Sequence, residues 1–289
     1  MTGVKSLTAL AAAFLVCLSI AAPAASATGK PGVAALQVAL RARGLYAGTI
    51  DGVAGPGTVA AVRRFQRRVG LPVDGVAGPQ TRSAFGRYGQ HRFGTRLLHT
   101  RKSGWDVAAL QFALASHGFP SGTFDGGFGP RTDAALRHFQ RWAHLGADGV
   151  AGPATYAALR RAPPRCPIRL RRPLHARIGD VFGPRGNRFH PGIDLPTSYG
   201  ARVHAAASGR VVYAGWDSGG YGYLVTLAHR GGVHTMYAHL SHVRVRRGQW
   251  VRVGNLVGNV GASGEATGPH LHFEVRLRGA AVNPLPALR

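Results

Sequence analysis

Hydrophobic residues in the first half of the chain recur at the spacing of one helix face. Val33, Leu36 and Leu40 stand at positions i, i+3 and i+7, which predicts a short amphipathic helix with one buried face. Two later stripes have the same spacing: Val62, Phe65 and Val69, and Val107, Leu110 and Leu114. This half of the chain is therefore predicted to be all-α.

The helical stripes belong to an internal repeat. Leu36-Gln37 returns as Leu110-Gln111, and Phe65-Gln66 returns as Phe139-Gln140, each 74 residues later. The motif Asp-Gly-x-x-Gly-Pro-x-Thr occurs four times, beginning at Asp51, Asp74, Asp125 and Asp148. Each Asp-Gly pair predicts a turn, and each proline predicts the first position of a helix. The repeat predicts two compact three-helix modules, at residues 31–86 and 105–160.

Structural roles account for most residues of the repeat. The Asp-Gly turns lack the alternating oxygen ligands of a calcium-binding loop, so turn chemistry explains them. The apolar motif positions are expected in the core: Leu36, Phe65, Leu110 and Phe139. The adjoining glutamines have two open roles, either capping the turns or binding a glycan: Gln37, Gln66, Gln111 and Gln140.

The pattern changes to short strands in the C-terminal region. Segments rich in β-branched or aromatic residues alternate with glycine-rich turns such as Ser218-Gly219-Gly220, which predicts an all-β region. The expected strands cover residues 203–213, 223–227, 233–240, 250–253, 256–260 and 270–277. The predicted fold class is multidomain, with two small all-α three-helix modules followed by an all-β antiparallel-sheet domain at residues 178–289.

Two connectors are expected between these units. Residues 87–104 are polar and contain glycine and arginine. Residues 161–177 are rich in arginine and proline and contain no acidic residue, which predicts an extended, semi-rigid linker. We expect this linker to be solvated, with contact to an anionic wall polymer as the alternative.

The first residues have the pattern of a secretory signal peptide. Lys5 precedes an apolar stretch, and Ala25-Ser26-Ala27 supplies a small-residue cleavage site. Cleavage after Ala27 would make residues 1–27 the signal peptide and would place the mature protein outside the cytoplasm. The apolar run is shorter than the roughly 20 residues of a membrane-spanning helix, and no later segment is long enough. Cys166 is then the single cysteine and is expected to be inert.

Charge narrows the range of partners without naming one. The chain has 36 Lys and Arg against 11 Asp and Glu, a formal net charge of +25, which suits an anionic polymer. Secretion argues against nucleic acid and leaves anionic lipid or cell-wall polymers. Abundant arginine also fits a GC-rich genome, so charge alone assigns no partner.

Candidate chemistry is concentrated in three histidine motifs of the β region. They are His190-x-x-x-Asp194, Tyr237-Ala238-His239-Leu240 and His270-Leu271-His272-Phe273-Glu274. Residues two apart on a strand point to the same face, so His270 and His272 are expected to enter one cleft. Imidazole and carboxylate are the ligands that zinc prefers at catalytic sites, where three protein ligands leave one position open.

Each N-terminal unit resembles the three-helix peptidoglycan-binding domains of bacterial wall hydrolases. The resemblance is carried by the Leu-Gln near the start, the Phe-Gln of the middle helix and the Asp-Gly…Gly-Pro-x-Thr turns. It implies that the modules bind peptidoglycan and serve to target the protein rather than to catalyse a reaction.

The region from about residue 178 to residue 288 resembles the lysostaphin-type (LytM-like) zinc endopeptidases. Besides the histidine motifs, the matching segments are Phe182-Gly183, Ala205-Ala206, Gly248-Gln249, Thr267-Gly268-Pro269 and Val282-Asn283-Pro284. The resemblance implies that His190, Asp194 and His272 hold zinc and that His239 and His270 are catalytic, with the choice of general base between these two left open. Glu274 is expected to give structural support.

The resemblance implies a secreted, monomeric cell-wall hydrolase. It would be a zinc-dependent endopeptidase that cleaves peptide bonds in the stem or cross-bridge peptides of peptidoglycan, held on the wall by its two modules. The alternative is a non-catalytic peptidoglycan-binding scaffold or an activator of other wall hydrolases, and the complete ligand set favours the enzyme. A purely structural zinc site usually has four protein ligands, and the sequence offers three.

Overall fold

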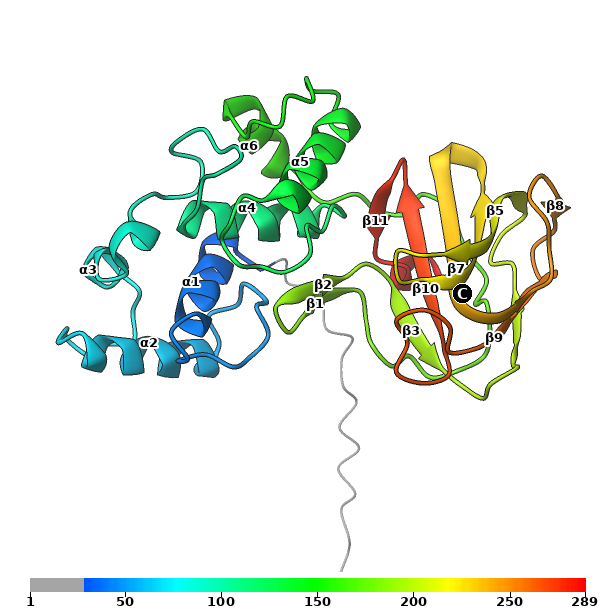
Figure 1. Cartoon of the computed structure of the whole chain (residues 1–289), viewed down its shortest axis with the longest axis horizontal. Helices are drawn as coiled ribbons and strands as arrows, with labels where there is room; N and C mark the ends of the chain where they lie inside the picture. Colours follow the sequence, from blue (N-terminus) through cyan, green and yellow to red (C-terminus); the bar gives the residue numbers. More distant parts are fainter. Residues whose placement is uncertain (1–28) are drawn as a thin grey trace, which may run out of the picture.

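The computed structural model describes residues 29–289, and the predicted signal peptide at residues 1–27 lies outside them (Figure 1). Helices occupy the N-terminal part, and a β-rich part formed by the C-terminal residues lies beside them. This arrangement confirms the predicted fold class. Within residues 29–289, no helix has the length and apolar character needed to cross a bilayer.

Six α-helices in the described part of the chain form the two modules, three in each. The first module contains α1 (Pro31–Arg41), α2 (Pro56–Arg68) and α3 (Pro79–Ser83), followed by the 3-10 turn η1 (Gly86–Gly89). The second contains α4 (Trp105–Ser116), α5 (Pro130–Trp142) and α6 (Pro153–Leu159). All of these helices except α4 begin with proline, whose missing N–H costs nothing at the first helical position.

A buried glutamine holds each of the four Asp-Gly turns. Gln37 Nε2 donates to Asp51 Oδ1 at 2.7 Å and to Thr58 Oγ1 at 3.1 Å, while Gln37 Oε1 accepts from the Gly52 N–H at 2.9 Å. The other three glutamines make the corresponding bonds in their own turns: Gln66, Gln111 and Gln140. All four side chains are buried. Of the two open roles, capping the turn is the correct one.

The apolar core of the first module is shared with the second module, which also has a core of its own. Helix α1 packs against α4, and α4 is buried on every face from Trp105 to Ala115. The core of the first module therefore contains Phe112 and Phe124 of the second module beside its own Leu40. A helix that is apolar on most of its surface must be covered on several sides, which explains why α4 lies between the modules.

The C-terminal part is built on an antiparallel sheet with the strand order β11-β10-β7-β6-β5-β8. Strand β3 also pairs with β10, and β9 pairs with both β4 and β7. The strands of this sheet are β3 (Ile193–Pro196), β4 (Arg202–His204), β5 (Gly209–Asp217), β6 (Gly222–Ala228), β7 (Val233–Val243), β8 (Trp250–Val251), β9 (Leu256–Val260), β10 (His270–Leu277) and β11 (Ala280–Val282). A separate hairpin of β1 (Gly183–Arg185) and β2 (Arg188–His190) precedes them. The sequence pattern missed β1, β2, β3 and β11, which are short.

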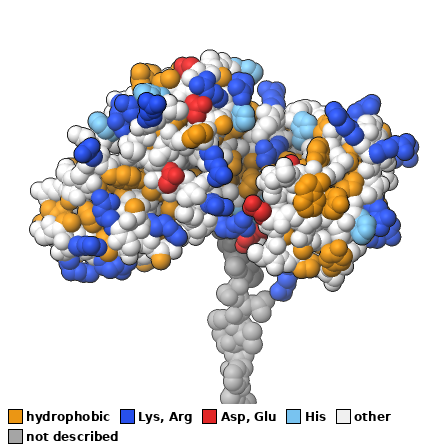
Figure 2. Space-filling view, in the orientation of Figure 1, with side chains coloured by type: hydrophobic (Ala, Val, Ile, Leu, Met, Phe, Trp, Pro, Cys, Tyr) orange, Lys and Arg blue, Asp and Glu red, His pale blue; other side chains and the backbone are white. Residues whose placement is uncertain are grey.

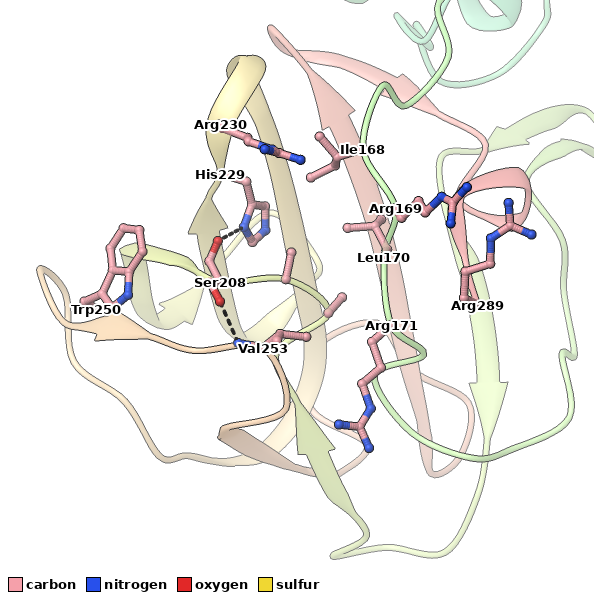
Figure 3. A pocket seen from close by; sticks show the side chains of 12 residues that line it. Ile168, Arg169, Leu170, Arg171, Ser208, His229, Arg230, Trp250, Val253 and Arg289 are labelled. Carbon is pink, nitrogen blue, oxygen red and sulfur yellow. Dashed lines mark hydrogen bonds between the residues drawn. The ribbon is translucent and has the colours of Figure 1, made fainter.

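Both connectors pack against the domains that they join. Leu98 is fully buried in the core of the second module, and Leu170 is buried in the core of the sheet domain. The stretch 168–171 forms one wall of a hollow of about 550 Å³ on the sheet domain (Figure 3). The prediction of a solvated linker at residues 161–177 is therefore wrong for its second half. Its few aliphatic side chains reach an apolar surface, which the arginine-rich composition of the segment does not reveal.

Candidate metal centre and active site

Three side chains with metal-ligand atoms converge at one edge of the sheet. His190 ends β2, Asp194 lies on β3, and His272 lies on β10 directly opposite Asp194 in the β3–β10 ladder. Asp194 Oδ1 lies 2.7 Å from His272 Nδ1 and 3.2 Å from His190 Nε2, and these two nitrogens are 3.1 Å apart. The three ligand atoms all lie within 4.8 Å of one another, a separation that a single cation can span.

The second ring nitrogen of His190 and of His272 is held by a hydrogen-bond acceptor. His190 Nδ1 lies 3.0 Å from the Val181 carbonyl oxygen, and His272 Nε2 lies 3.1 Å from Glu274 Oε1. A ring nitrogen that donates to an oxygen carries the proton, which leaves the lone pair on the other nitrogen. These contacts therefore turn Nε2 of His190 and Nδ1 of His272 toward the shared centre, where a neutral ring offers that nitrogen to a cation.

His239 and His270 stand beside this centre, and each has its Nδ1 held by a backbone carbonyl oxygen. His239 Nδ1 lies 2.8 Å from the Ser263 carbonyl oxygen, and His270 Nδ1 lies 2.8 Å from the Gly268 carbonyl oxygen. Their ring centroids are 4.8 Å apart, and His270 Nε2 is 3.8 Å from Asp194 Oδ1. Each ring thus has Nδ1 tied to the backbone, and Nε2 is the nitrogen left for a substrate or a water molecule.

The backbone of His239 has a left-handed conformation, with φ of 58°. It lies in β7, where the pairing with β6 shifts register between Tyr237 and Leu240, and its N–H donates to the Tyr221 carbonyl oxygen at 2.9 Å. Non-glycine residues with positive φ are uncommon, and they cluster at functional sites. The irregularity places His239 in the cleft, an orientation that alternation along a regular strand does not predict.

Glu274 is the centre of a buried hydrogen-bond network behind His272. Its carboxylate accepts from Tyr221 Oη at 2.6 Å, from His272 Nε2 at 3.1 Å and from Arg276 Nε at 2.8 Å. Arg276 also donates to Tyr221 Oη at 3.1 Å. The side chain of Glu274 is fully buried, so three donors replace the water that it loses on folding. The network fixes the plane of the His272 ring.

The surroundings lower the pKa values of Asp194, Glu274 and His239, each for a different reason. Burial alone would raise the pKa of Asp194, but hydrogen bonds from His190 and His272 hold it well below its usual range. Burial likewise opposes ionisation of Glu274, yet the Arg276 charge and the His272 hydrogen bond lower its pKa to about 2. Burial lowers the pKa of His239, aided by the neighbouring histidines. His239 is therefore neutral at neutral pH and able to accept a proton.

An open cleft of about 800 Å³ leads to these residues. Its walls come from the start of β3, the β5–β6 turn at residues 219–221 and the segment 265–270 before β10. Among the residues that the structure describes, none from either helical module lines it. The side chains at the centre are thus accessible to a polymer approaching from outside.

Comparison with known families agrees with this division of the chain. Residues 188–284 match Peptidase family M23, and residues 29–85 and 103–159 each match the family described as "Putative peptidoglycan binding domain". The C-terminal domain is thus a domain of peptidase family M23 of the LytM-like kind. The two N-terminal modules are domains of the second family, which confirms both resemblances drawn from the sequence.

Two named relatives have different activities. The chain is 42% identical over 118 residues to the DD-carboxypeptidase/endopeptidase Mpg of Neisseria meningitidis, covering 39% of this chain and 27% of the relative. It is 38% identical over 115 residues to the murein hydrolase activator NlpD of Escherichia coli, covering 39% of this chain and 29% of the relative. The chain therefore spans about a quarter of the length of the curated relatives that it matches.

Solved structures with similar sequence include the catalytic domain of the antimicrobial peptidase lysostaphin from Staphylococcus simulans. That domain is 33% identical, with a TM-score of 0.37, and the match covers 38% of this chain and 90% of that chain. A zinc-containing peptidase from Vibrio cholerae is also 33% identical, with a TM-score of 0.36, covering 37% of this chain and 35% of that one.

The structure brings together all five site residues named from the sequence, with Glu274 behind them. Sequence reasoning missed Arg276 and gave Tyr221 no firm role. A signal for Arg276 was present, because positions 270, 272, 274 and 276 alternate along one strand and share a face. No comparable signal exists for Tyr221, because it reaches Glu274 from a turn that lies 53 residues earlier.

Proposed function

We propose that the chain is a secreted, zinc-dependent endopeptidase that cleaves peptide bonds in the stem or cross-bridge peptides of peptidoglycan. One observation carries the proposal above all. A complete group of three ligand atoms and two further imidazoles, each with one nitrogen anchored, opens onto a single accessible cleft. In this proposal the catalytic domain covers residues 178–289, and modules 31–86 and 105–160 serve binding.

The donor set fits zinc at a catalytic rather than a structural site. His190, Asp194 and His272 supply two imidazole nitrogens and one carboxylate oxygen, which are ligand types that zinc prefers. Both imidazoles are oriented by a second hydrogen bond, as is usual for metal-binding histidines. A structural site usually closes with a fourth protein ligand, often cysteine. Cys166, the free cysteine of the described residues, instead contacts the Ile168 carbonyl oxygen and packs at the edge of the core of the sheet domain.

Zinc bound to these residues would act as a Lewis acid on the scissile carbonyl and lower the pKa of water to about 7. Side chains of the protein transfer the protons and stabilise the developing charge. His239, kept neutral by burial, and His270 offer their Nε2 atoms to take up the proton of the attacking water and return it to the leaving amine. The ring that has taken up this proton can then donate a hydrogen bond from Nε2 to the carbonyl oxygen as negative charge develops on it.

The two modules supply wall retention in this proposal. Linking a binding module to a catalytic domain raises the effective concentration of substrate at the cleft. The net charge of +25 adds attraction to anionic wall polymers, which is screened at high salt. Secretion follows from the signal-peptide pattern at residues 1–27.

The test is digestion of isolated peptidoglycan sacculi by the purified protein, followed by mass spectrometry of the released fragments. We expect new peptide termini with the zinc-loaded protein. We expect none after chelation, with His272→Ala, or with His239→Gln, which keeps all three metal ligands. The terminus produced identifies the bond that is cut.

The similarity to the murein hydrolase activator NlpD supports a second candidate function, activation of another wall hydrolase, which the same experiment can test. A protein that binds sacculi and cleaves no wall type, yet accelerates a separate wall hydrolase added to the reaction, would be an activator. That result would overturn the enzyme proposal.

A further inference from the structure

The β1–β2 hairpin joins the metal-ligand group to the helical modules. Its two-residue turn is Gly186-Asn187, between the paired residues Arg185 and Arg188. Gly186 has φ of 58°, the positive value that glycine supplies at the first position of a type II′ turn. The hairpin then continues through β2 to His190. Two residues, Arg188 and Phe189, therefore separate the turn from His190, a predicted metal ligand.

One backbone N–H from each module holds the hairpin turn. The Ile50 N–H donates to the Gly186 carbonyl oxygen, and the Phe124 N–H donates to the Asn187 carbonyl oxygen, both at 2.8 Å. Ile50 and Phe124 are equivalent positions of the 74-residue repeat, and each directly precedes an Asp-Gly turn. The paired modules thus bring two repeat-related donors to successive carbonyls of one turn. Neither module alone could make both bonds.

The side chain of Phe189 anchors the hairpin to the modules. It is half-buried, packs against the shared core of the modules, and lies edge-on to Phe182 with ring centroids 5.0 Å apart. Successive side chains of a strand point to opposite faces. When Phe189 is seated in the module core, the next residue, His190, is turned away from the modules and toward Asp194 and His272.

A second attachment lies at the far edge of the sheet. The Ala281 N–H of β11 donates to the Gly118 carbonyl oxygen of the second module at 3.0 Å, and Ala280 is buried in the core of that module. Strand β11 pairs with β10, which carries His270 and His272. The first attachment therefore holds a hairpin whose Arg185 and His190 line the cleft, and the second holds a strand that pairs with β10.

We propose that the paired modules form a clamp that positions His190 through the β1–β2 hairpin, with Phe189 as the main positioning residue. The modules then contribute to the metal centre itself, in addition to holding the protein on the wall. This inference rests on the proposed metal site, because it assigns His190 the role of a ligand. Phe189 does not touch substrate or metal and acts only through the direction of His190.

The experiment measures zinc affinity and hydrogen exchange of the full chain, with the wild type compared with Phe189→Ala, Phe189→Leu and Phe93→Ala. Zinc affinity is read by competition with a chromogenic chelator, and exchange is read by mass spectrometry on peptides covering residues 183–190. Phe93 is the matched control, because it is also a half-buried phenylalanine packed on the module cores, where it contacts Tyr156 rather than the hairpin.

We expect Phe189→Ala to weaken zinc binding by about tenfold or more, the size seen when a group that orients a metal ligand is lost. The hairpin amides should exchange faster in the same variant. Phe189→Leu, which keeps an apolar anchor, should recover most of both effects, and Phe93→Ala should leave zinc affinity unchanged.

Three results would overturn the clamp. They are a Phe189→Ala protein with wild-type zinc affinity, a Phe93→Ala protein that loses as much affinity as Phe189→Ala, or unchanged exchange of the hairpin in Phe189→Ala. A wild type that binds no zinc would instead contradict the proposed metal site, and the hairpin exchange would still decide whether Phe189 fastens the hairpin.

Discussion

Replacing Glu274 with glutamine tests the network behind His272 at nearly constant side-chain volume. The three groups around the carboxylate all donate to it: Tyr221, His272 and Arg276. The glutamine amide nitrogen would place a donor against one of these donors, and the Arg276 charge would lose its buried partner.

The size of the effect follows from burial. Removing one partner of a buried ion pair costs about 3–5 kcal/mol. Glu274 is fully buried, whereas the side chain of Arg276 is 32% exposed, so water can partly replace the lost partner. We therefore expect Glu274→Gln to lower the free energy of unfolding by about 3 kcal/mol. Because the His272 ring loses its charged acceptor, zinc affinity should also fall by about 10–100-fold.

Urea unfolding of the metal-free protein measures the first effect, and chelator competition measures the second. The control is Glu265→Gln, since Glu265 is the other glutamate of the chain and is exposed. It should change neither quantity appreciably. If Glu274→Gln loses stability but keeps wild-type zinc affinity, Glu274 does not orient His272. If stability is also unchanged, the assumption that the carboxylate is ionised and paired is wrong.

Three further predictions concern other parts of the molecule. Gln111→Leu should destabilise the protein by about 2–4 kcal/mol in urea unfolding, because it leaves several buried partners of the amide without a bond; an unchanged midpoint would mean that the turn does not need its glutamine. Gly118→Ala should lower the free energy of unfolding clearly more than Gly44→Ala does. Both glycines have positive φ, but only at Gly118 would the new Cβ lie 2.2 Å from a carbonyl oxygen, that of Ala281. Equal losses of stability would mean that backbone strain alone causes the penalty. Burial lowers the pKa of His229 below 6.5 in the folded protein. Between the two pKa values the unfolded chain therefore binds more protons than the folded one. The free energy of unfolding should fall as the pH drops below about 6.5 and level off below the folded-state pKa. Unfolding measured across this range should show a shallower fall for His229→Gln than for the wild type.

Local patterns predicted the elements well. The i, i+3, i+7 stripes and the Asp-Gly turns define the helices and where they begin, because these signals lie within a few residues of each other. Val69 is the exception, since it lies just past the end of α2 and is exposed. Alternation along residues 270–277 correctly placed His270 and His272 on one face. The short strands β1 and β2 were missed because their stability comes from contacts with other domains rather than from their own sequence.

Long-range features could not be predicted in the same way. The conformation of His239 depends on a register shift between β6 and β7, and Tyr221 reaches Glu274 from a distant turn. The burial of Leu170 depends on an apolar surface formed by the sheet domain. In each case the deciding partner is far away in the chain, and neither residue type nor spacing identifies it.

The shared core of the helical modules has a consequence for how the protein unfolds. Helix α4 completes the core of the first module while belonging to the second. The two repeats are therefore not independent folding units. Removing either one would expose the apolar surface of its neighbour, and isolated repeats would tend to aggregate. The helical half should therefore melt in one cooperative transition, although its sequence is divided into two similar units.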